Sequence, residues 1–203
     1  MARKFTAAQL RATVSAIVTA AGSSAQEAQT VADNLVLANL SGHDSHGVGM
    51  VPRYVDAVLE GGLKPNTGIE VKFDGGSLLT VDGQRGYGQV VGEQAMRLAM
   101  QRAQDTGSCV MALANAHHLG RIGHFAEMAV ERGLVSIHFV NVQSRPVVAP
   151  SAAATAATAP TPSASASPWP AGRLSCWTSR PAAWPRARCA WRTTRGARLS
   201  PAT

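Results

Sequence analysis

Apolar residues in the first third of the chain recur with the spacing of amphipathic helices. In residues 6–22 they lie on one helical face, and Thr6 is placed to cap the N-terminus of that helix. Ser24 is followed three positions later by Glu27, the pattern of a capping box that opens a second helix. A third, short helix is predicted over 51–60, before two consecutive glycines end it.

The hydrophobic period then changes from that of helices to that of strands. "IEVKF" (69–73) and "SLLTV" (77–81) flank an Asp-Gly-Gly turn, which predicts a β-hairpin. The remaining predicted elements are helices over 88–105 and 121–132 and buried strands over 108–114 and 135–142. Strands with continuous apolar runs, separated by helices, favour parallel pairing.

The predicted fold class is therefore α/β. Residues 1–66 form an N-terminal helical cap, and residues 67–150 form a domain built on a mixed or parallel sheet. Residues 151–203 are rich in Ala, Pro and Ser and lack Ile, Val, Phe and Met, so we expect a disordered tail there.

The formal net charge of +7 suggests a nucleic-acid binder until its distribution is considered. All seven excess positive charges are arginines in residues 151–203, whereas residues 1–150 are neutral overall. A basic footprint is expected on a folded face or helix, so this distribution argues against a nucleic-acid partner.

The cysteines and the apolar stretches indicate a cytoplasmic protein without a membrane partner. The three cysteines have no CxxC or zinc-finger spacing, and Cys109 lies in an apolar run typical of a buried free thiol. The N-terminus "MARKFTAAQL" is not a secretory signal, and no stretch has the length of a membrane span.

Five of the six histidines fall in two loop clusters at the ends of predicted elements. "SGHDSHG" carries His43 and His46, and "NAHHLGRIGH" carries His117, His118 and His124. A histidine between a strand and a helix suits proton transfer, because its ordinary pKa lies near neutrality. A metal site built by His43, His46 and His118 is a rival, but no carboxylate lies at a convincing ligand spacing, so we expect no metal.

"GYGQVVG" (86–92) looks like a dinucleotide-binding fingerprint but has the wrong spacing. Its glycines follow GxGxxxG, and a DGQR loop separates them from the preceding strand. We interpret the segment as a glycine-rich helix start packed closely against its neighbour.

Three segments together resemble the malate/L-lactate dehydrogenase type 2 family, closest to its hydroxycarboxylate dehydrogenase B group. They are "HDSHGVGMVPRYVDAVLEGG", "VDGQRGYGQV" and "NAHHLGRIGHFAEMA", within a likeness that covers about residues 5–150. The resemblance implies a non-Rossmann fold, a homodimer, and NAD or NADP as cofactor. It also implies hydride transfer between NAD(P)H and a small-molecule 2-oxo acid or 2-hydroxy acid.

The resemblance assigns roles to residues of both histidine clusters. His118 matches the family's acid/base histidine, while Ser45 and His46 match a serine–histidine relay that exchanges the proton in other members. The resemblance leaves open which histidine moves the proton. The residues that match cofactor contacts are His46, Leu119, Gly120 and Arg121.

The resemblance also places substrate recognition on the predicted helix over 51–60. Tyr54 matches an aromatic residue near the substrate. Many members carry a carboxylate-binding arginine where this chain has Met50, and Arg53, one helical turn further on, is the substitute that we assign.

After Pro150 the family continues with a sequence like FGGSDGRYGTNP, whereas this chain reads "SAAATAATAPTP". Loss of one base there would spell each tail residue from the last two bases of one codon and the first of the next. That rule permits the family sequence at all twelve positions of 151–162 and LDFATSRLAQGKVRVAHNKG at all twenty of 177–196. We therefore interpret 151–203 as an out-of-frame tail. The alternative to an active oxidoreductase is a frameshifted, truncated fragment with no activity of its own.

Overall fold

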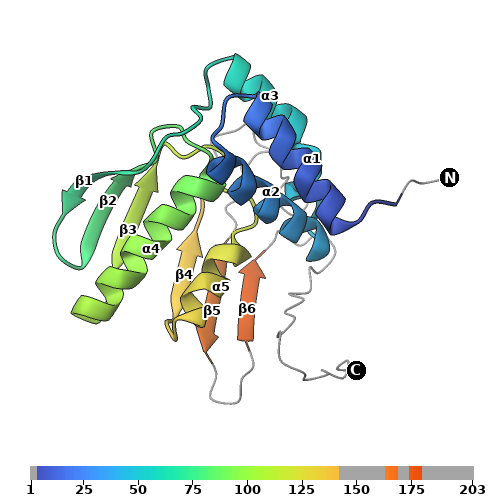
Figure 1. The fold of residues 1–203 in the computed structure, drawn as a ribbon. Coiled ribbons are helices and arrows are strands. Elements are labelled where there is room, and N and C mark those ends of the chain that lie inside the picture. The colour runs from blue at the N-terminus through green and yellow to red at the C-terminus, as the bar shows by residue number, and fades with distance from the viewer. Residues whose placement is uncertain (1–3, 142–162, 169–173, 180–203) are drawn as a thin grey trace, which may run out of the picture.

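The computed structural model of the protein describes residues 4–141, 163–168 and 174–179 (Figure 1). Helices come first in the chain, a three-stranded sheet follows, and a second three-stranded sheet comes last. In Figure 1, α4 (Gly88–Thr106) crosses in front of the first sheet and α5 (Gly123–Glu131) in front of the second. This arrangement confirms the predicted α/β fold class.

The first two helices begin at the predicted caps. Helix α1 (Ala7–Ala20) is capped by Thr6, and α2 (Ala25–Leu40) by Ser24, whose hydroxyl accepts from the Glu27 N–H. The second half of the predicted capping box is replaced by Asn66. Its Oδ1 accepts from the Ser24 N–H at 2.6 Å, and its own N–H donates to the Glu27 carboxylate at 2.8 Å. Asn66 thereby joins the start of α2 to the loop that leads into the sheet.

Two short 3-10 turns, η1 (Asp44–His46) and η2 (Val48–Met50), connect α2 to α3 (Val51–Leu59). Helix α3 confirms the predicted third helix, and Gly61, with φ of +74°, follows its end. The shared core of this helical region also includes Tyr87, which directly precedes α4. The buried residues of this core are Val14, Val18, Ala28, Val31, Ala32, Leu35, Val51, Tyr54, Leu63 and Tyr87.

The first sheet has the order β1-β2-β3 and confirms the predicted hairpin. Strand β1 (Glu70–Asp74) pairs antiparallel with β2 (Leu78–Asp82), and β2 pairs parallel with β3 (Val110–Ala114) across the intervening α4. Leu79 and Val81 on β2 are buried in one cluster with Ala95 of α4, and Cys109 packs there half-buried. The unit β2-α4-β3 is a parallel strand–helix–strand unit, but it is formed by β2 and β3 and not by the two apolar runs 108–114 and 135–142 for which parallel pairing was predicted.

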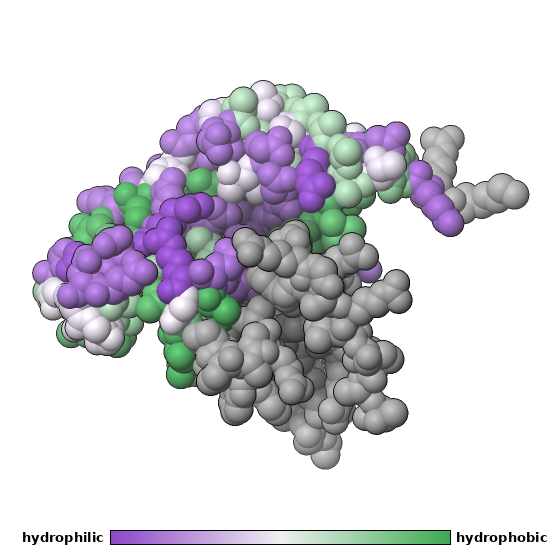
Figure 2. Space-filling view, turned by 60° about the horizontal axis from the view of Figure 1, so that its bottom comes forward, coloured by the Kyte–Doolittle hydropathy of each residue, from purple (hydrophilic) through white to green (hydrophobic). Residues whose placement is uncertain are grey.

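The prediction that 108–114 and 135–142 are buried strands of one sheet is wrong. Strand β4 (Ser136–Phe139) belongs to the second sheet, and the side chains of Val110, Ile137 and Phe139 are exposed. Apolar runs are typical of strands covered on both faces, but a helix covers only one face of each strand among the described residues. Figure 2 shows the resulting apolar surface as green residues among hydrophilic ones.

Two parts of the tail also differ from the expectation of disorder. Strand β5 (Ser163–Pro168) pairs antiparallel with β4, and β6 (Leu174–Ser179) pairs antiparallel with β5. Pairing at a strand edge uses main-chain N–H and C=O groups, so the absence of Val, Ile and Phe from the tail does not prevent it. The remaining predictions for 151–203 lie outside the described residues. Within the described part of the chain, no helix combines the length and apolarity that crossing a membrane requires.

The glycines of "GYGQVVG" pack the start of α4 closely against its neighbours, as predicted. A Cβ atom on Gly88 would lie 2.5 Å from the main-chain oxygen of His117 and closer still to that of His118. A Cβ atom on Gly92 would lie 2.6 Å from the Phe125 ring. The first turn of α4 therefore contacts the second histidine cluster directly.

We expect Gly88→Ala to destabilise the protein by about 1–3 kcal/mol, because the added methyl group meets backbone that cannot move aside without displacing the histidine turn. Urea unfolding of the two chains measures the difference. Gly49→Ala is the matched control, since a Cβ atom there meets nothing within 4 Å. Equal stability of the Gly88→Ala variant and the unchanged chain would contradict the close packing.

Candidate active site

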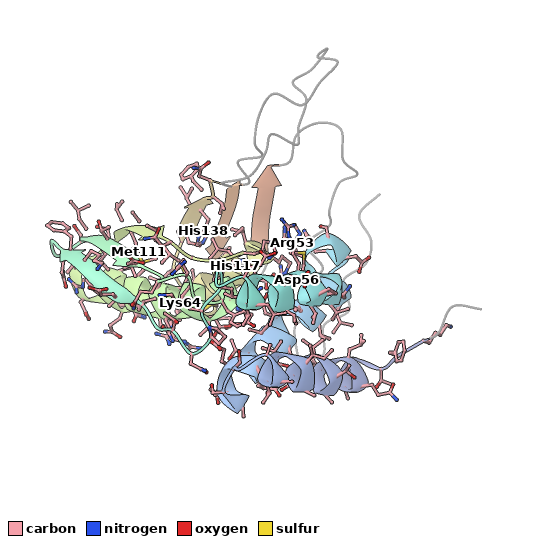
Figure 3. The ribbon with its side chains drawn as sticks, turned by 90° about the horizontal axis from the view of Figure 1, so that it is seen from above. Arg53, Asp56, Lys64, Met111, His117 and His138 are labelled. Atoms are coloured by element: carbon pink, nitrogen blue, oxygen red, sulfur yellow. The ribbon has the colours of Figure 1, made fainter. Side chains whose placement is uncertain are left out.

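The two histidine clusters, distant in sequence, meet in the structure. The rings of His46 and His118 stack with centroids 5.3 Å apart and planes inclined by 27°. His46 is on η1, whereas His118 follows β3 in the loop that leads to α5. In Figure 3, His117 of that loop and Arg53 of α3 lie beside each other.

Hydrogen bonds to neighbouring segments hold both loops in place. The Asn39 side chain of α2 accepts from the Val48 N–H at 2.8 Å and donates to Asp44 at 2.5 Å, which fixes the turn around His46. In the second loop, the His117 N–H donates to the Gly86 oxygen at 3.1 Å. Each histidine cluster is therefore positioned by an element outside its own loop.

Tyr54 connects α3, α4 and the second histidine cluster. Its side chain is fully buried, with an exposed fraction of 0%. The Tyr54 hydroxyl oxygen accepts from Gln89 Nε2 at 2.6 Å and lies 2.7 Å from His118 Nδ1. Gln89 was not among the residues predicted from the sequence. Its available signal was a polar side chain on the buried face of a helix, in the first turn of α4.

The surroundings of His118 favour its neutral form. Burial is the main cause that lowers the pKa of His118 to about 4, and the positive charges of His46, His117 and Arg53 act in the same direction. Burial also lowers the pKa of His117 and raises that of the Tyr54 hydroxyl above its ordinary value. At neutral pH the site therefore contains a neutral imidazole against a protonated phenol.

This lowered pKa predicts a loss of stability in acid. The unfolded chain binds a proton at His118 below about pH 6.5, but the folded chain does so only below about pH 4. We therefore expect the free energy of unfolding to decrease as the pH falls from 6.5 to 4. Urea unfolding across this range should show a smaller decrease in the His118→Gln variant. Identical pH dependence of the two chains would contradict the lowered pKa of His118.

Ser45 and His46 form the second pair of the site. Ser45 Oγ lies 2.8 Å from His46 Nδ1, and Ser45 is exposed while His46 is half-buried. His43 lies edge-on to His46 at 6.5 Å, and its Nδ1 is 3.3 Å from the Ser41 oxygen. Among the described residues, no three His, Cys, Asp or Glu side chains are grouped so that they could hold a metal ion.

The turn formed by Leu119, Gly120 and Arg121 uses its side chains for packing. Leu119 packs against a buried cluster of α4 and α5. The Arg121 guanidinium is 6% exposed and makes a bidentate ion pair with Glu127, with distances of 2.8 and 2.5 Å. Gly120 has φ of +75°, and a Cβ atom there would lie 2.9 Å from Asn34 Oδ1. The Arg121 side chain is therefore engaged by Glu127, whereas the main chain of the turn carries none of these contacts.

The structure thus brings together a neutral histidine, a buried tyrosine and a serine–histidine pair, on an α/β scaffold without a glycine-rich phosphate loop among the described residues. Side chains of these kinds are the ones that proteins use for proton transfer. The sequence profile of the malate/L-lactate dehydrogenase family matches residues 5–175, and the chain belongs to this family.

Individual relatives agree with this assignment. Hydroxycarboxylate dehydrogenase B of Escherichia coli (strain K12) is 45% identical over 147 residues, which are 72% of this chain and 41% of that protein. Malate dehydrogenase of Pyrococcus abyssi is 43% identical over 134 residues, 66% of this chain and 36% of that protein. The structure of malate dehydrogenase from Pyrococcus horikoshii superposes with a TM-score of 0.78 at 36% identity, covering 87% of this chain and 50% of that one.

This chain spans less than half the length of these curated relatives. The similarities confirm the family and the fold class that the sequence predicted. The matched relatives are themselves named as dehydrogenases.

Proposed function

We propose that the protein transfers a hydride between NAD(P)H and a 2-oxo acid, forming the 2-hydroxy acid, and catalyses the reverse reaction. The observation that carries this proposal is the contact of His46 and His118 beside the buried Tyr54 hydroxyl. Reduction of a carbonyl group gives its carbon a hydride and its oxygen a proton. A dehydrogenase therefore needs a proton-exchanging group at this oxygen, and this site offers two.

The proposed catalytic residues are His118, His46 and Ser45. In this proposal, one of the two histidines exchanges the proton with the substrate oxygen. Ser45 orients His46 through the 2.8 Å contact between Oγ and Nδ1. Tyr54 orients His118 in the same manner, through the 2.7 Å contact at Nδ1. The two rings, being stacked, can serve the same reacting centre.

Arg53 is the proposed partner of the substrate carboxylate. It is exposed, so its guanidinium is accessible, and its positive charge lowers the pKa values of His117 and His118. A charge that acts on both histidines lies within electrostatic reach of the site. Bidentate pairing with a guanidinium is a favourable way to hold a carboxylate.

Some polar atoms around the Gly120 turn suit hydrogen bonds to a nicotinamide cofactor. Among the described residues, His117 Nδ1 and both side-chain polar atoms of Asn34 are buried without a hydrogen-bond partner, which supports a ligand or an ordered water at this place. The proposed contacts are His46 and the main chain of Leu119, Gly120 and Arg121, since the Arg121 guanidinium already pairs with Glu127. When bound, the nicotinamide ring supplies or accepts the hydride. NAD and NADP both remain in the proposal.

We propose further that the protein works as a cytoplasmic homodimer on small molecules, without nucleic-acid or membrane partners. The exposed apolar residues of β3 and β4 support a homodimer, because a second subunit could cover them. Large exposed apolar patches mark contact surfaces, and Val110, Ile137 and Phe139 are between 67% and 77% exposed.

Nucleotide protection in a thermal melt tests the proposal on the chain as it stands. A nucleotide present at about 100 times its dissociation constant adds about 2.7 kcal/mol of stability. We expect NADH or NADPH to raise the melting temperature. If neither does, and metal analysis instead finds an ion bound in a 1:1 ratio, the metal-dependent alternative built on His43, His46 and His118 replaces the proposal.

A further inference from the structure

A chain of hydrogen bonds leads from α4 to the imidazole of His118. Gln89 Nε2 donates to the Tyr54 hydroxyl oxygen at 2.6 Å, and that oxygen is 2.7 Å from His118 Nδ1. Gln89 and Tyr54 are both fully buried, so water does not compete for these groups. Gln89 belongs to none of the segments to which the sequence assigned a catalytic or binding role.

The direction of the chain follows from its first donor. Because Tyr54 oxygen accepts a hydrogen from Gln89, the Tyr54 O–H is left to donate, and His118 Nδ1 is the acceptor within reach. The opposite amide orientation would let Gln89 Oε1 accept from Tyr54 but would bury both amide hydrogens. In the observed orientation Gln89 Oε1 lacks a partner among the described residues, and Nε2 uses one of its two hydrogens. Orphaned buried N–H groups are rarer than under-satisfied oxygens, which favours the first direction.

We propose that Gln89 is a positioning residue that acts through Tyr54 to keep neutral His118 protonated on Nε2. The part of this inference that concerns catalysis rests on the proposed function. In this tautomer, His118 donates a hydrogen bond from Nε2 to the oxygen of the reacting carbon and cannot accept a proton there. Neutral imidazole that polarises a carbonyl in this manner is an established catalytic device. His46, with Ser45, is then the group that exchanges the proton.

The same chain opposes protonation of His118. An imidazolium must donate from Nδ1, so Tyr54 would have to accept from His118 and from Gln89 together, and its own hydrogen would lose its acceptor. This effect adds to burial and to the charged groups that face the ring, which are His46, His117 and Arg53. Removing the Gln89 donor frees Tyr54 to turn, and the imidazolium becomes easier to form.

Nitrogen-15 NMR of the histidine side chains in the full-length chain tests the proposal without any need for activity. We expect long-range proton–nitrogen spectra at neutral pH to show His118 with its proton on Nε2 and an accepting Nδ1. In the Gln89→Met variant, which keeps the side-chain volume but not the donor, the pKa of His118 should rise by about one pH unit. Gln101→Met is the matched control, because Gln101 lies exposed on the same helix and bonds only to Asp105 among the described residues.

A double-mutant cycle separates positioning from a merely structural role. If Gln89 acts through the Tyr54 hydroxyl, Gln89→Met should have no further effect on the His118 pKa in the Tyr54→Phe background. An equal rise in both backgrounds would overturn the proposal, as would a His118 ring protonated on Nδ1 in the unchanged chain. If Gln89→Met does not fold, the tautomer of His118 in the unchanged chain still tests the proposal. If NMR confirms the tautomer but neither NADH nor NADPH raises the melting temperature, the proposed role of Gln89 stands. Only the proposed oxidoreductase function is then refuted.

Discussion

Restoring one base between the codons for Pro150 and Ser151 is expected to increase NAD(P)H-dependent turnover strongly over that of the chain as it stands. The expectation rests on the thirty-two positions of 151–162 and 177–196 that a one-base shift converts into family-like sequence. The restored frame regains FGGSDGRYGTNP, which the family resemblance identifies as a cofactor-binding loop. The kcat of the restored protein should then lie within the ordinary enzyme range of about 1–1000 per second.

The matched control inserts three bases at the same point, which adds one residue and leaves the downstream frame unchanged. This control should gain no turnover. Sequencing the DNA tests the frameshift before any kinetic measurement, because the restored frame should run well past codon 203. A stop codon within a few positions would refute the frameshift. The family match continues to residue 175, beyond the proposed shift, so the DNA rather than the match decides the point.

In the active protein, His118→Ala is expected to reduce kcat by about 10²–10⁴-fold, the usual contribution of a positioned acid, base or hydrogen-bond donor. The ring is held by Tyr54 on one edge and by His46 across its face, so its loss removes a preorganised group. Steady-state kinetics with the preferred 2-oxo acid measures the effect. We expect KM to change less than kcat, since the interaction is strongest in the transition state.

His138→Ala controls for the general effect of removing a histidine. His138 is on β4, its Nε2 contacts Ser136, and it touches neither histidine cluster among the described residues. Its replacement should leave kcat close to that of the parent protein. Near-normal turnover in the His118→Ala variant would exclude His118 from the chemistry.

Local signals predicted the elements that local interactions control. Thr6 and Ser24 begin helices because their hydroxyls satisfy free N–H groups of the first turn, and such caps are visible in sequence. The Asp-Gly-Gly turn likewise predicted the β1–β2 hairpin. Glu27 shows the limit of such signals: its partner is Asn66, which lies 39 positions away and has no local relation to it.

The features that could not be predicted from the sequence depend on long-range packing. An apolar run predicts a strand but not how many of its faces are covered, so the exposure of Val110 and Ile137 was missed. The two histidine clusters were recognised as chemistry, yet their stacking and the Tyr54 contact depend on three separate segments. Gln89 was missed because a glutamine in a helix is usually a solvated side chain. Arg121 was identified by motif, but its side chain is committed to Glu127.

The oxidation of NADH and NADPH by the frame-restored protein with a panel of 2-oxo acids tests the proposed function most directly. We expect at least one coenzyme to be consumed only when a 2-oxo acid is present, with formation of the 2-hydroxy acid. We also expect His118→Ala to abolish most of this consumption and His138→Ala to leave it in place. If neither coenzyme is oxidised with any 2-oxo acid, or if the His118→Ala variant is as active as its parent, the site around Tyr54 and His118 is not the catalytic centre of a 2-hydroxy acid dehydrogenase.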